Sequence, residues 1–157
     1  MHKIKPAKVD DVGIILTMIR ELAQWEGDSA DVTANQELLT ESLFGSASIA
    51  KVFIAYLADQ PVGCMIYCPK FCAYTGRNEI YLQDLYLRKA VRGSGLGLAF
   101  MKRLAAIALK SNASRIEWFV DKNNTKAWSF YEKLGAQVIE SIKVVRLDDD
   151  NLRILAD

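Results

Sequence analysis

A glycine-rich hexapeptide, RGSGLG, occupies residues 92–97 between two apolar runs. The run at 80–87 has the composition of a strand, and the run at 98–109 has the pattern of a helix. A glycine-rich turn from a strand into a helix directs several main-chain N–H groups at one point, where the helix dipole favours negative charge. Glycine lets a ligand approach the backbone closely, and Arg92 adds a charged donor. The segment therefore predicts a phosphate-binding loop.

Two common phosphate motifs do not fit this segment. The nucleotide loop G-x-x-x-x-G-K-[ST] needs a lysine beside its last glycine, but the first lysine after Gly93 is Lys102. A dinucleotide-binding G-x-G-x-x-G needs a small residue where Leu98 stands, and it belongs in the first strand-to-helix turn of a doubly wound domain. The alternative without a ligand is a helix that happens to begin with glycines.

Length and composition indicate one globular α/β domain over residues 1–157. Apolar residues make up 51% of the chain and charged residues 25%, and the net charge is +1, which gives no electrostatic reason to expect nucleic acid. Residues 1–13 lack the apolar core of a signal peptide, and no apolar stretch approaches the ~20 residues that a bilayer requires. We therefore expect a cytoplasmic protein without a membrane partner.

The sequence argues against metal chemistry. His2 is the only histidine, so a histidine-dependent triad or a His-ligated zinc site lacks its parts. Cys64, Cys68 and Cys72 are four residues apart, and Pro69 disfavours a helix that would stack them. On a strand, neighbouring thiols at this spacing would be about 13 Å apart, too far to share an ion. Reduced thiols and no metal are the expectation.

The apolar pattern predicts a mixed, mostly antiparallel sheet flanked by helices, in the order β-α-α-β-β-β-α-β-α-β. The expected strands are 3–9, 52–58, 62–68, 79–87, 115–120 and 142–147, and the expected helices are 11–25, 33–44, 96–109 and 125–134. Asp10 is the expected cap of the first helix, and Thr33 with Gln36 forms the capping box of the second. Gly45 and Gly135 should end helices, residues 59–61 should form a turn, and residues 148–151 should turn the chain into an apolar tail.

Two motifs together resemble the GNAT superfamily of N-acetyltransferases. Residues 92–97 resemble its R/Q-x-x-G-x-G/A signature. Residues 123–136 resemble its N-x-x-A-x-x-F-Y-x-x-L-G-[FA] segment and match at Asn124, Ala127, Phe130, Tyr131, Leu134 and Gly135. Residues 20–26, 115–136 and 144–156 are most similar to the diamine, or spermidine/spermine-type, acetyltransferase branch.

The resemblance implies acetyl-CoA as co-substrate. It places the pyrophosphate on main-chain amides of the loop and the pantetheine arm along the main chain of the preceding strand, with an N–H near Leu85 holding the negative charge that develops on the thioester carbonyl. The implied cofactor-binding residues are Leu85, Tyr86, Leu87, Arg92, Gly93, Ser94, Gly95, Leu96, Gly97, Leu98 and Asn124.

The resemblance also implies the catalytic groups. Tyr131 stands where the family keeps its tyrosine acid, which would protonate the departing thiolate; the alternative is a packed tyrosine with a hydrogen-bonded hydroxyl. Asp84 and Glu26 match acidic positions of the branch and are candidates for accepting the proton of the amine, directly or through water. At Gln83 the branch usually carries a glutamate, and an amide cannot take a proton.

The implied substrate-binding residues are Trp25, Glu26, Gln83 and Asp84. Asp28 and Asp31 could also attract a cationic amine, or could belong to a solvated loop, and Trp128 is expected to fill core. The expected function is acetylation of a primary amine on a small diamine, polyamine or lysine-like molecule. Acetylation of a protein lysine or N-terminus, and a catalytically inactive CoA-binding sensor, are the alternatives. The resemblance further implies a homodimer.

Overall fold

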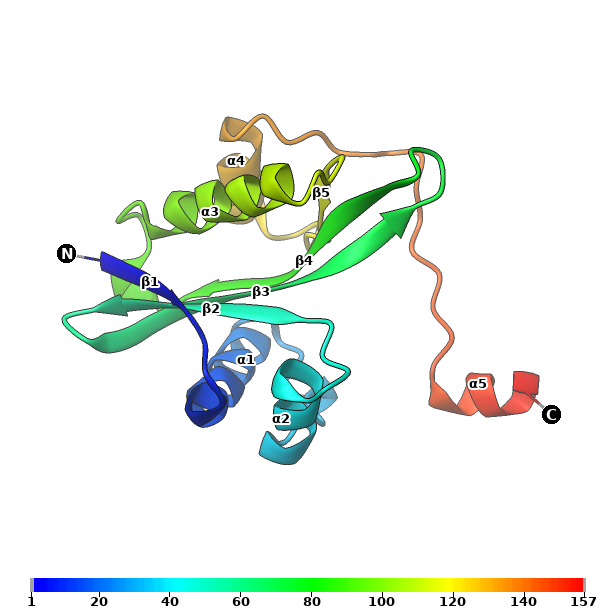
Figure 1. The fold of residues 1–157 in the computed structure, drawn as a ribbon, viewed down its shortest axis with the longest axis horizontal. Helices are drawn as coiled ribbons and strands as arrows, with labels where there is room; N and C mark the ends of the chain where they lie inside the picture. The colour runs from blue at the N-terminus through cyan, green and yellow to red at the C-terminus, as the bar shows by residue number, and fades with distance from the viewer. Residues whose placement is uncertain (1, 157) are drawn as a thin grey trace. The chain divides into compact units, whose positions relative to one another are not determined.

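The computed structural model describes residues 2–156, and the described chain forms two compact units, Met1–Phe119 and Val120–Asp157 (Figure 1). Each unit is described by itself below. The expectation of one domain over residues 1–157 stays a prediction. Among residues 2–156, no helix has the length and apolar content needed to cross a bilayer.

The first unit is built on a mixed sheet, which confirms the predicted α/β class. Within the described residues this sheet has five strands in the order β1-β2-β3-β4-β5. The strands are β1 (His2–Pro6), β2 (Lys51–Leu57), β3 (Gln60–Cys72), β4 (Arg77–Leu87) and β5 (Ile116–Glu117). Neighbours are antiparallel except β4 and β5, which run parallel. The long β3–β4 hairpin is therefore the centre of the unit.

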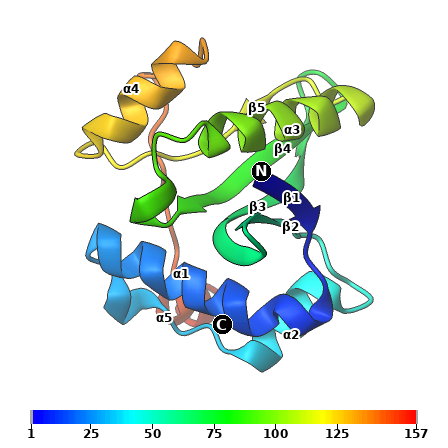
Figure 2. The ribbon, with the colours of Figure 1, turned by 90° about the vertical axis from the view of Figure 1, so that its left-hand side faces the viewer.

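Helices cover both faces of this sheet. α1 (Val12–Glu26) and α2 (Gln36–Phe44) lie on one face, and α3 (Leu96–Lys110) lies on the other (Figures 1 and 2). Ile15 and Met18 of α1 pack with Ile54, Cys64 and other buried strand residues. On α3, the three-and-four spacing of Leu96, Phe100, Leu104 and Ala108 gives that helix its buried stripe.

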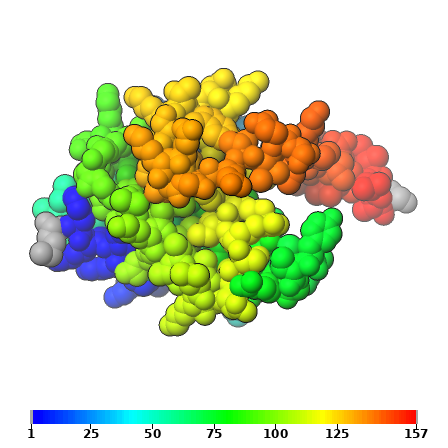
Figure 3. Space-filling view, turned by 90° about the horizontal axis from the view of Figure 1, so that it is seen from above, coloured from blue at the N-terminus to red at the C-terminus, as the bar shows by residue number. Residues whose placement is uncertain are grey.

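The second unit contains two helices among its described residues, α4 (Thr125–Lys133) and α5 (Asp149–Ala156). The predicted strand at 142–147 is wrong, because these residues form an irregular connection between the two helices (Figure 1). Figure 3 draws the connection as orange to red spheres. Its alternating pattern has no sheet edge to pair with in this unit, and a strand needs such a neighbour. The predicted apolar tail is a helix, since the Asp148 side chain accepts from the Asn151 amide at 3.2 Å and opens α5.

The predicted N-terminal caps of the first two helices were wrong. Asp11 rather than Asp10 precedes α1, and its carboxylate accepts from the Lys8 amide at 2.7 Å in a 3-10 turn, Val9–Asp11. α2 begins at Gln36 and is capped by Asn35, whose side chain accepts from the Leu38 amide at 2.9 Å, so the capping box at Thr33 is wrong. α2 ends at Gly45, as predicted.

Two strand predictions also needed correction. The turn between β2 and β3 is Ala58–Asp59 instead of 59–61, and both residues have positive φ, as a two-residue type I′ hairpin requires. Pro61 belongs to β3, which extends to Cys72. β5 is confined to Ile116–Glu117, although the apolar run at 115–120 is longer.

Replacing Ala58 with glycine should stabilise the protein. Ala58 has a φ of 49°, in the left-handed region that is strained for a residue with a Cβ. We expect Ala58→Gly to raise the free energy of unfolding by about 1 kcal/mol in urea denaturation.

The same substitution at Ala106 is the matched control. Ala106 is exposed in the interior of α3, where glycine should destabilise by about 1 kcal/mol. A destabilising effect at both positions would contradict the type I′ hairpin.

Candidate functional site

The sheet opens between β4 and β5. The two strands pair at Ile80 with Ile116 and at Tyr81 with Glu117. β4 continues to Leu87 and remains paired with β3 over that length. The described pairing between β4 and β5 ends at Tyr81. Residues 82–87 therefore have an open edge on the side of β4 that faces away from β3. The main-chain groups of this edge can hydrogen-bond an extended ligand.

A β-bulge at Gln83 sets which groups reach this edge. Asp84 pairs with Ile66 and Leu82 pairs with Tyr67, so Gln83 is the extra residue. Directly opposed residues share a face, and Ile66 lies in the core packed against α1. The bulge therefore turns Asp84 to the α1 face, where an uninterrupted strand would have turned it to the α3 face.

The bulge also determines which main-chain N–H and C=O groups of β4 point to the open edge. The Arg88 amide donates to the Val62 carbonyl at 2.9 Å, so alternation along an antiparallel strand directs the main-chain groups of Tyr86 toward β3. Those of Leu85 and Leu87 point to the open edge. Of the three residues predicted to hold the pantetheine arm, Leu85 and Leu87 thus have main-chain groups on the open edge, although the Leu87 carbonyl already accepts from Arg92.

The glycine-rich loop follows this edge directly. A 3-10 turn, Lys89–Val91, leads into it, and Gly93 and Gly95 have φ angles of 79° and 87°. Gly95 is the N-cap of α3, and its carbonyl accepts the Ala99 amide at 3.0 Å, so the amides of residues 96–98 precede the first helical hydrogen bond. A Cβ at Gly93 or Gly95 would meet open space. Positive φ, open space and helix N-terminal amides fit a pyrophosphate.

Two side chains of the loop make internal contacts. The Ser94 hydroxyl donates to the Val91 carbonyl at 2.7 Å and tightens the turn. The Arg92 Nε donates to the Leu87 carbonyl at 2.8 Å, and its guanidinium lies 4.7 Å from the Trp25 ring centre and 5.9 Å from that of Tyr86. In this structure the guanidinium of Arg92 therefore joins the end of α1 to the end of β4.

Asp84 lies half-buried on the α1 face. Burial raises the pKa of its carboxyl, so this group holds a proton more readily than an exposed aspartate. Burial, followed by the charges of Asp84 and Glu21, raises the pKa of the neighbouring Cys64 thiol to about 12. Glu21 accepts from Arg88, which follows β4, at 2.9 and 3.0 Å. The raised pKa of Asp84 suits this carboxyl to accepting a proton.

The other residues predicted for the acceptor lie near the end of α1 or on the bulge. Trp25 is 48% exposed and is held by Arg92, and Glu26 is the last residue of α1. Gln83 is exposed. Asp28 and Asp31 lie in the exposed segment after α1, around the 3-10 turn Ser29–Asp31.

The second unit carries the remaining predicted residues on α4. Asn124 is its N-cap and accepts from the Ala127 amide at 3.1 Å, so it shapes the helix that carries Tyr131. The rings of Phe130 and Tyr131 are 5.1 Å apart. Trp128 is half-buried and donates from its ring to the Asp121 carbonyl at 3.0 Å; no residue of α4 is buried, so the expected core position of Trp128 is not observed.

Cys64, Cys68 and Cys72 all lie on β3 and are free thiols. Among the described residues, no three His, Cys, Asp or Glu side chains come close enough to hold a metal ion.

Comparison with known proteins identifies the family. The model of the acetyltransferase (GNAT) family matches residues 16–136. The chain belongs to this family. The match spans the opened sheet, the glycine loop and α4, and the family uses acetyl-CoA as co-substrate, which the geometry at the loop fits.

Individual relatives of this acetyltransferase extend over nearly its whole length. A thialysine N-epsilon-acetyltransferase from Bos taurus is 33% identical over 164 residues, covering 98% of this chain and 96% of that protein. A spermidine/spermine N(1)-acetyltransferase-like protein 1 from Homo sapiens is 30% identical over 148 residues, covering 88% of this chain and 21% of that protein. The solved structure of an integron cassette protein from the mobile metagenome of V. cholerae has a TM-score of 0.79 and 31% identity, and covers 99% of this chain and 97% of that one.

Sequence reasoning missed the bulge and the Glu21–Arg88 pair. The bulge follows from the register between β3 and β4, and no local residue type marks it. The ion pair joins residues 67 apart, on α1 and after β4. An acidic residue on the polar side of the first predicted helix and an arginine at the end of a strand were the available signals.

Asparagine at position 84 should stabilise the protein near neutral pH. Because burial raises the folded-state pKa of Asp84, the folded protein disfavours its ionised form, and stability is lost as pH rises through that pKa. We expect Asp84→Asn to raise the thermal midpoint at neutral pH, with the gain shrinking as pH falls from the folded-state pKa of Asp84 to its unfolded-state pKa and absent below that value. A gain that persisted at acid pH, or a loss at every pH, would contradict the environment described for Asp84.

Proposed function

We propose that this protein transfers the acetyl group of acetyl-CoA to a primary amine of a small cationic molecule of the lysine, ornithine or diamine kind. The observation that carries the proposal is the opened edge of β4, which leads directly into the glycine loop and places Asp84 beside it. The names of the relatives, a thialysine N-epsilon-acetyltransferase and a spermidine/spermine N(1)-acetyltransferase-like protein, support a small amine as the acceptor.

Binding of acetyl-CoA would use main-chain groups throughout. The amides of residues 96–98 and the positive-φ glycines suit the pyrophosphate, and the outward groups of Leu85 and Leu87 suit the amides of the pantetheine arm. Bound there, acetyl-CoA supplies an activated acetyl thioester. Because the ligand contacts backbone, the side chains of Leu96 and Tyr86 remain free to build the core.

The acceptor amine must lose a proton before it can attack. Its ammonium form is attracted to the acidic end of α1, where Glu26, Asp28 and Asp31 lie. Asp84, whose pKa is raised by burial, accepts the proton directly or through water, and Glu26 is the second candidate. Tyr131 donates a proton to the departing thiolate, since a phenol of pKa near 10 is a matched donor.

The same proposal includes a homodimer in the cytoplasm. In the second unit, apolar side chains are exposed along residues 138–155, and Val145 is 91% exposed. A second copy of the chain would remove this apolar surface from water. The oligomeric state follows from the mass in solution by light scattering, and a monomer at all concentrations would exclude the dimer.

The activity test is release of free thiol from acetyl-CoA in the presence of an amine panel. The panel contains thialysine, lysine, ornithine, putrescine, spermidine, and a peptide with an internal lysine. We expect turnover with one or more of the free amines, at a rate that rises as pH approaches the amine pKa. CoA binding without thiol release on any amine would favour a sensor, and release with the peptide alone would favour protein acetylation.

Removing the phenol of Tyr131 should slow turnover without weakening cofactor binding. We expect Tyr131→Phe to lower kcat by about 10- to 1000-fold, as general-acid groups contribute, and to leave the Kd for CoA near the wild-type value. Tyr74→Phe, at a fully exposed tyrosine of the β3–β4 hairpin, is the matched control. Equal kcat in the two variants would remove Tyr131 from the mechanism.

A carboxylate at position 83 should favour dicationic acceptors. Gln83 is exposed on the bulge beside Asp84, so Gln83→Glu adds a negative charge there with little effect on packing. We expect kcat/KM for putrescine to rise about 3- to 10-fold at low salt, with the gain falling as salt is added. Gln60→Glu adds the same charge at the exposed β2–β3 turn and should leave kcat/KM unchanged. The same gain in both variants would show that net charge, and not position 83, is responsible.

A further inference from the structure

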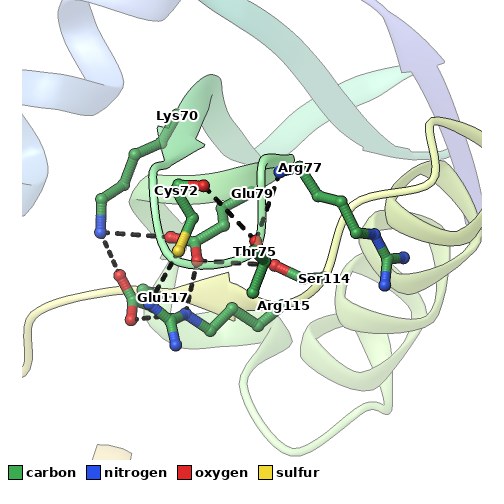
Figure 4. A network of polar contacts seen from close by, with 8 residues as sticks. All are labelled: Lys70, Cys72, Thr75, Arg77, Glu79, Ser114, Arg115 and Glu117. Carbon is green, nitrogen blue, oxygen red and sulfur yellow. Dashed lines mark hydrogen bonds and ion pairs between the residues drawn. The ribbon is translucent and has the colours of Figure 1, made fainter.

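Among the described residues, one charged side chain is fully buried: that of Glu79, with an exposed fraction of 0%. It lies on β4, and its carboxylate forms ion pairs with Arg115 Nε at 2.7 Å and with Lys70 Nζ at 3.4 Å (Figure 4). The Ser114 hydroxyl donates to the same carboxylate at 3.5 Å. A buried carboxylate is strongly destabilising unless such partners compensate for lost hydration.

A second carboxylate extends this cluster across three strands. Glu117 of β5 forms an ion pair with Arg115 Nε at 2.9 Å and accepts a hydrogen bond from Lys70 of β3. Two cations and two anions therefore alternate from β3 to β4 to β5, and the figure shows them converging on one point (Figure 4). We call Lys70, Glu79, Arg115 and Glu117 the charge cluster.

The charge cluster keeps Glu79 ionised. Burial acts to raise the pKa of Glu79, but Cys72, Lys70 and Arg115 together outweigh burial and hold that pKa below its usual range. If Glu79 were neutralised, Glu117 would be the one carboxylate of the cluster left to pair with Arg115 and Lys70. Removing one partner from a buried group of charges lowers the stability of the protein much more than breaking an exposed ion pair.

The position of the cluster relates it to the open edge. Glu79 directly precedes the two β4–β5 pairs, and Ile80 N–H donates to the Arg115 carbonyl at 3.0 Å. The Ser114 amide donates to the Asn78 carbonyl at 2.8 Å. Beyond Tyr81 the described ladder between the two strands ends, so the cluster lies at the closed end of the opening, close to the bulge.

We propose that the charge cluster is a clamp that holds β5 on β4 at this point and thereby sets the width of the opening where the acetyl thioester must lie. The inference rests on the function proposed above. Its residues are positioning residues, since they act through the strands and have no contact with the reacting atoms. Lys70, Glu79 and Arg115 of the cluster also line an open hollow of about 350 Å³ at the hairpin end.

The clamp and the glycine loop lie at opposite ends of the outward edge of β4. The pyrophosphate is held at the loop, and the thioester lies toward the bulge. Loosening the clamp should therefore misplace the thioester and slow turnover, while most of the affinity for CoA remains. Substitution of a residue that served stability alone would not lower turnover while leaving the affinity for CoA unchanged.

The test uses Glu79→Gln in the full chain, with Asp59→Asn as the matched control. Asp59 is exposed and forms a 3.5 Å ion pair with Lys3, so its variant loses one carboxylate in the same way. We expect Glu79→Gln to lower kcat at saturation by about tenfold, with the Kd for CoA changed by less than about twofold. Hydrogen exchange of the Ile80 and Ser114 amides should be faster than in the control.

A folded Glu79→Gln protein with wild-type kcat and control-like exchange at Ile80 would overturn the clamp. If that variant does not fold, Glu117→Gln removes two contacts of the half-exposed carboxylate and should shift kcat and exchange in the same direction by a smaller amount. An unchanged kcat and unchanged exchange there would also overturn it. If the wild type acetylates no amine, the proposed function fails, and the Ile80 and Ser114 exchange rates alone decide whether the cluster holds the strands together.

Discussion

A strand inside a sheet must find hydrogen-bond partners along both of its edges, and β4 finds them along only part of one. β3 pairs with it throughout, but the described ladder with β5 ends at Tyr81. An unpaired edge in the middle of a sheet would be unfavourable in a protein that bound nothing there. The bulge at Gln83 and the glycine loop after β4 become intelligible together once an extended ligand is taken as the missing neighbour.

Two carboxylates on the same face of β4 illustrate how neighbours divide roles within one strand. Glu79 is held by cations, which lower its pKa, whereas Asp84 is half-buried and burial raises its pKa. Their environments therefore separate a carboxylate that stays ionised more readily from one that takes up a proton more readily. β4 thus carries both Glu79, which we propose holds β5 in place, and Asp84, the proposed base.

Much of the fold could be predicted because its elements have strong local patterns. The strands at β2, β3 and β4 and the helices α1, α3 and α4 follow apolar periodicity, and Gly45 and Gly135 end helices where expected. The errors arose where a neighbour decides the outcome. Residues 142–147 alternate like a strand but have no edge to join, and Pro61 indicated a turn although Ala58 and Asp59 form it.

For the site, residue types were predictable and their orientation was not. The glycines predicted the loop, but the direction of Arg92 depends on Trp25 and the Leu87 carbonyl, which only the folded chain brings near. The face occupied by Asp84 depends on a bulge that arises from pairing with Ile66 and Tyr67. The charge cluster joins three strands, so no window of sequence contains it.

Residue-resolved hydrogen exchange with and without CoA tests the central claim most directly, and pantetheine, which lacks the pyrophosphate, is the comparison ligand. CoA should slow exchange of the Leu85 and Leu87 amides and of residues 96–98, whereas pantetheine should leave residues 96–98 unchanged. Slowing at other positions alone, or no slowing at millimolar CoA, would contradict the account.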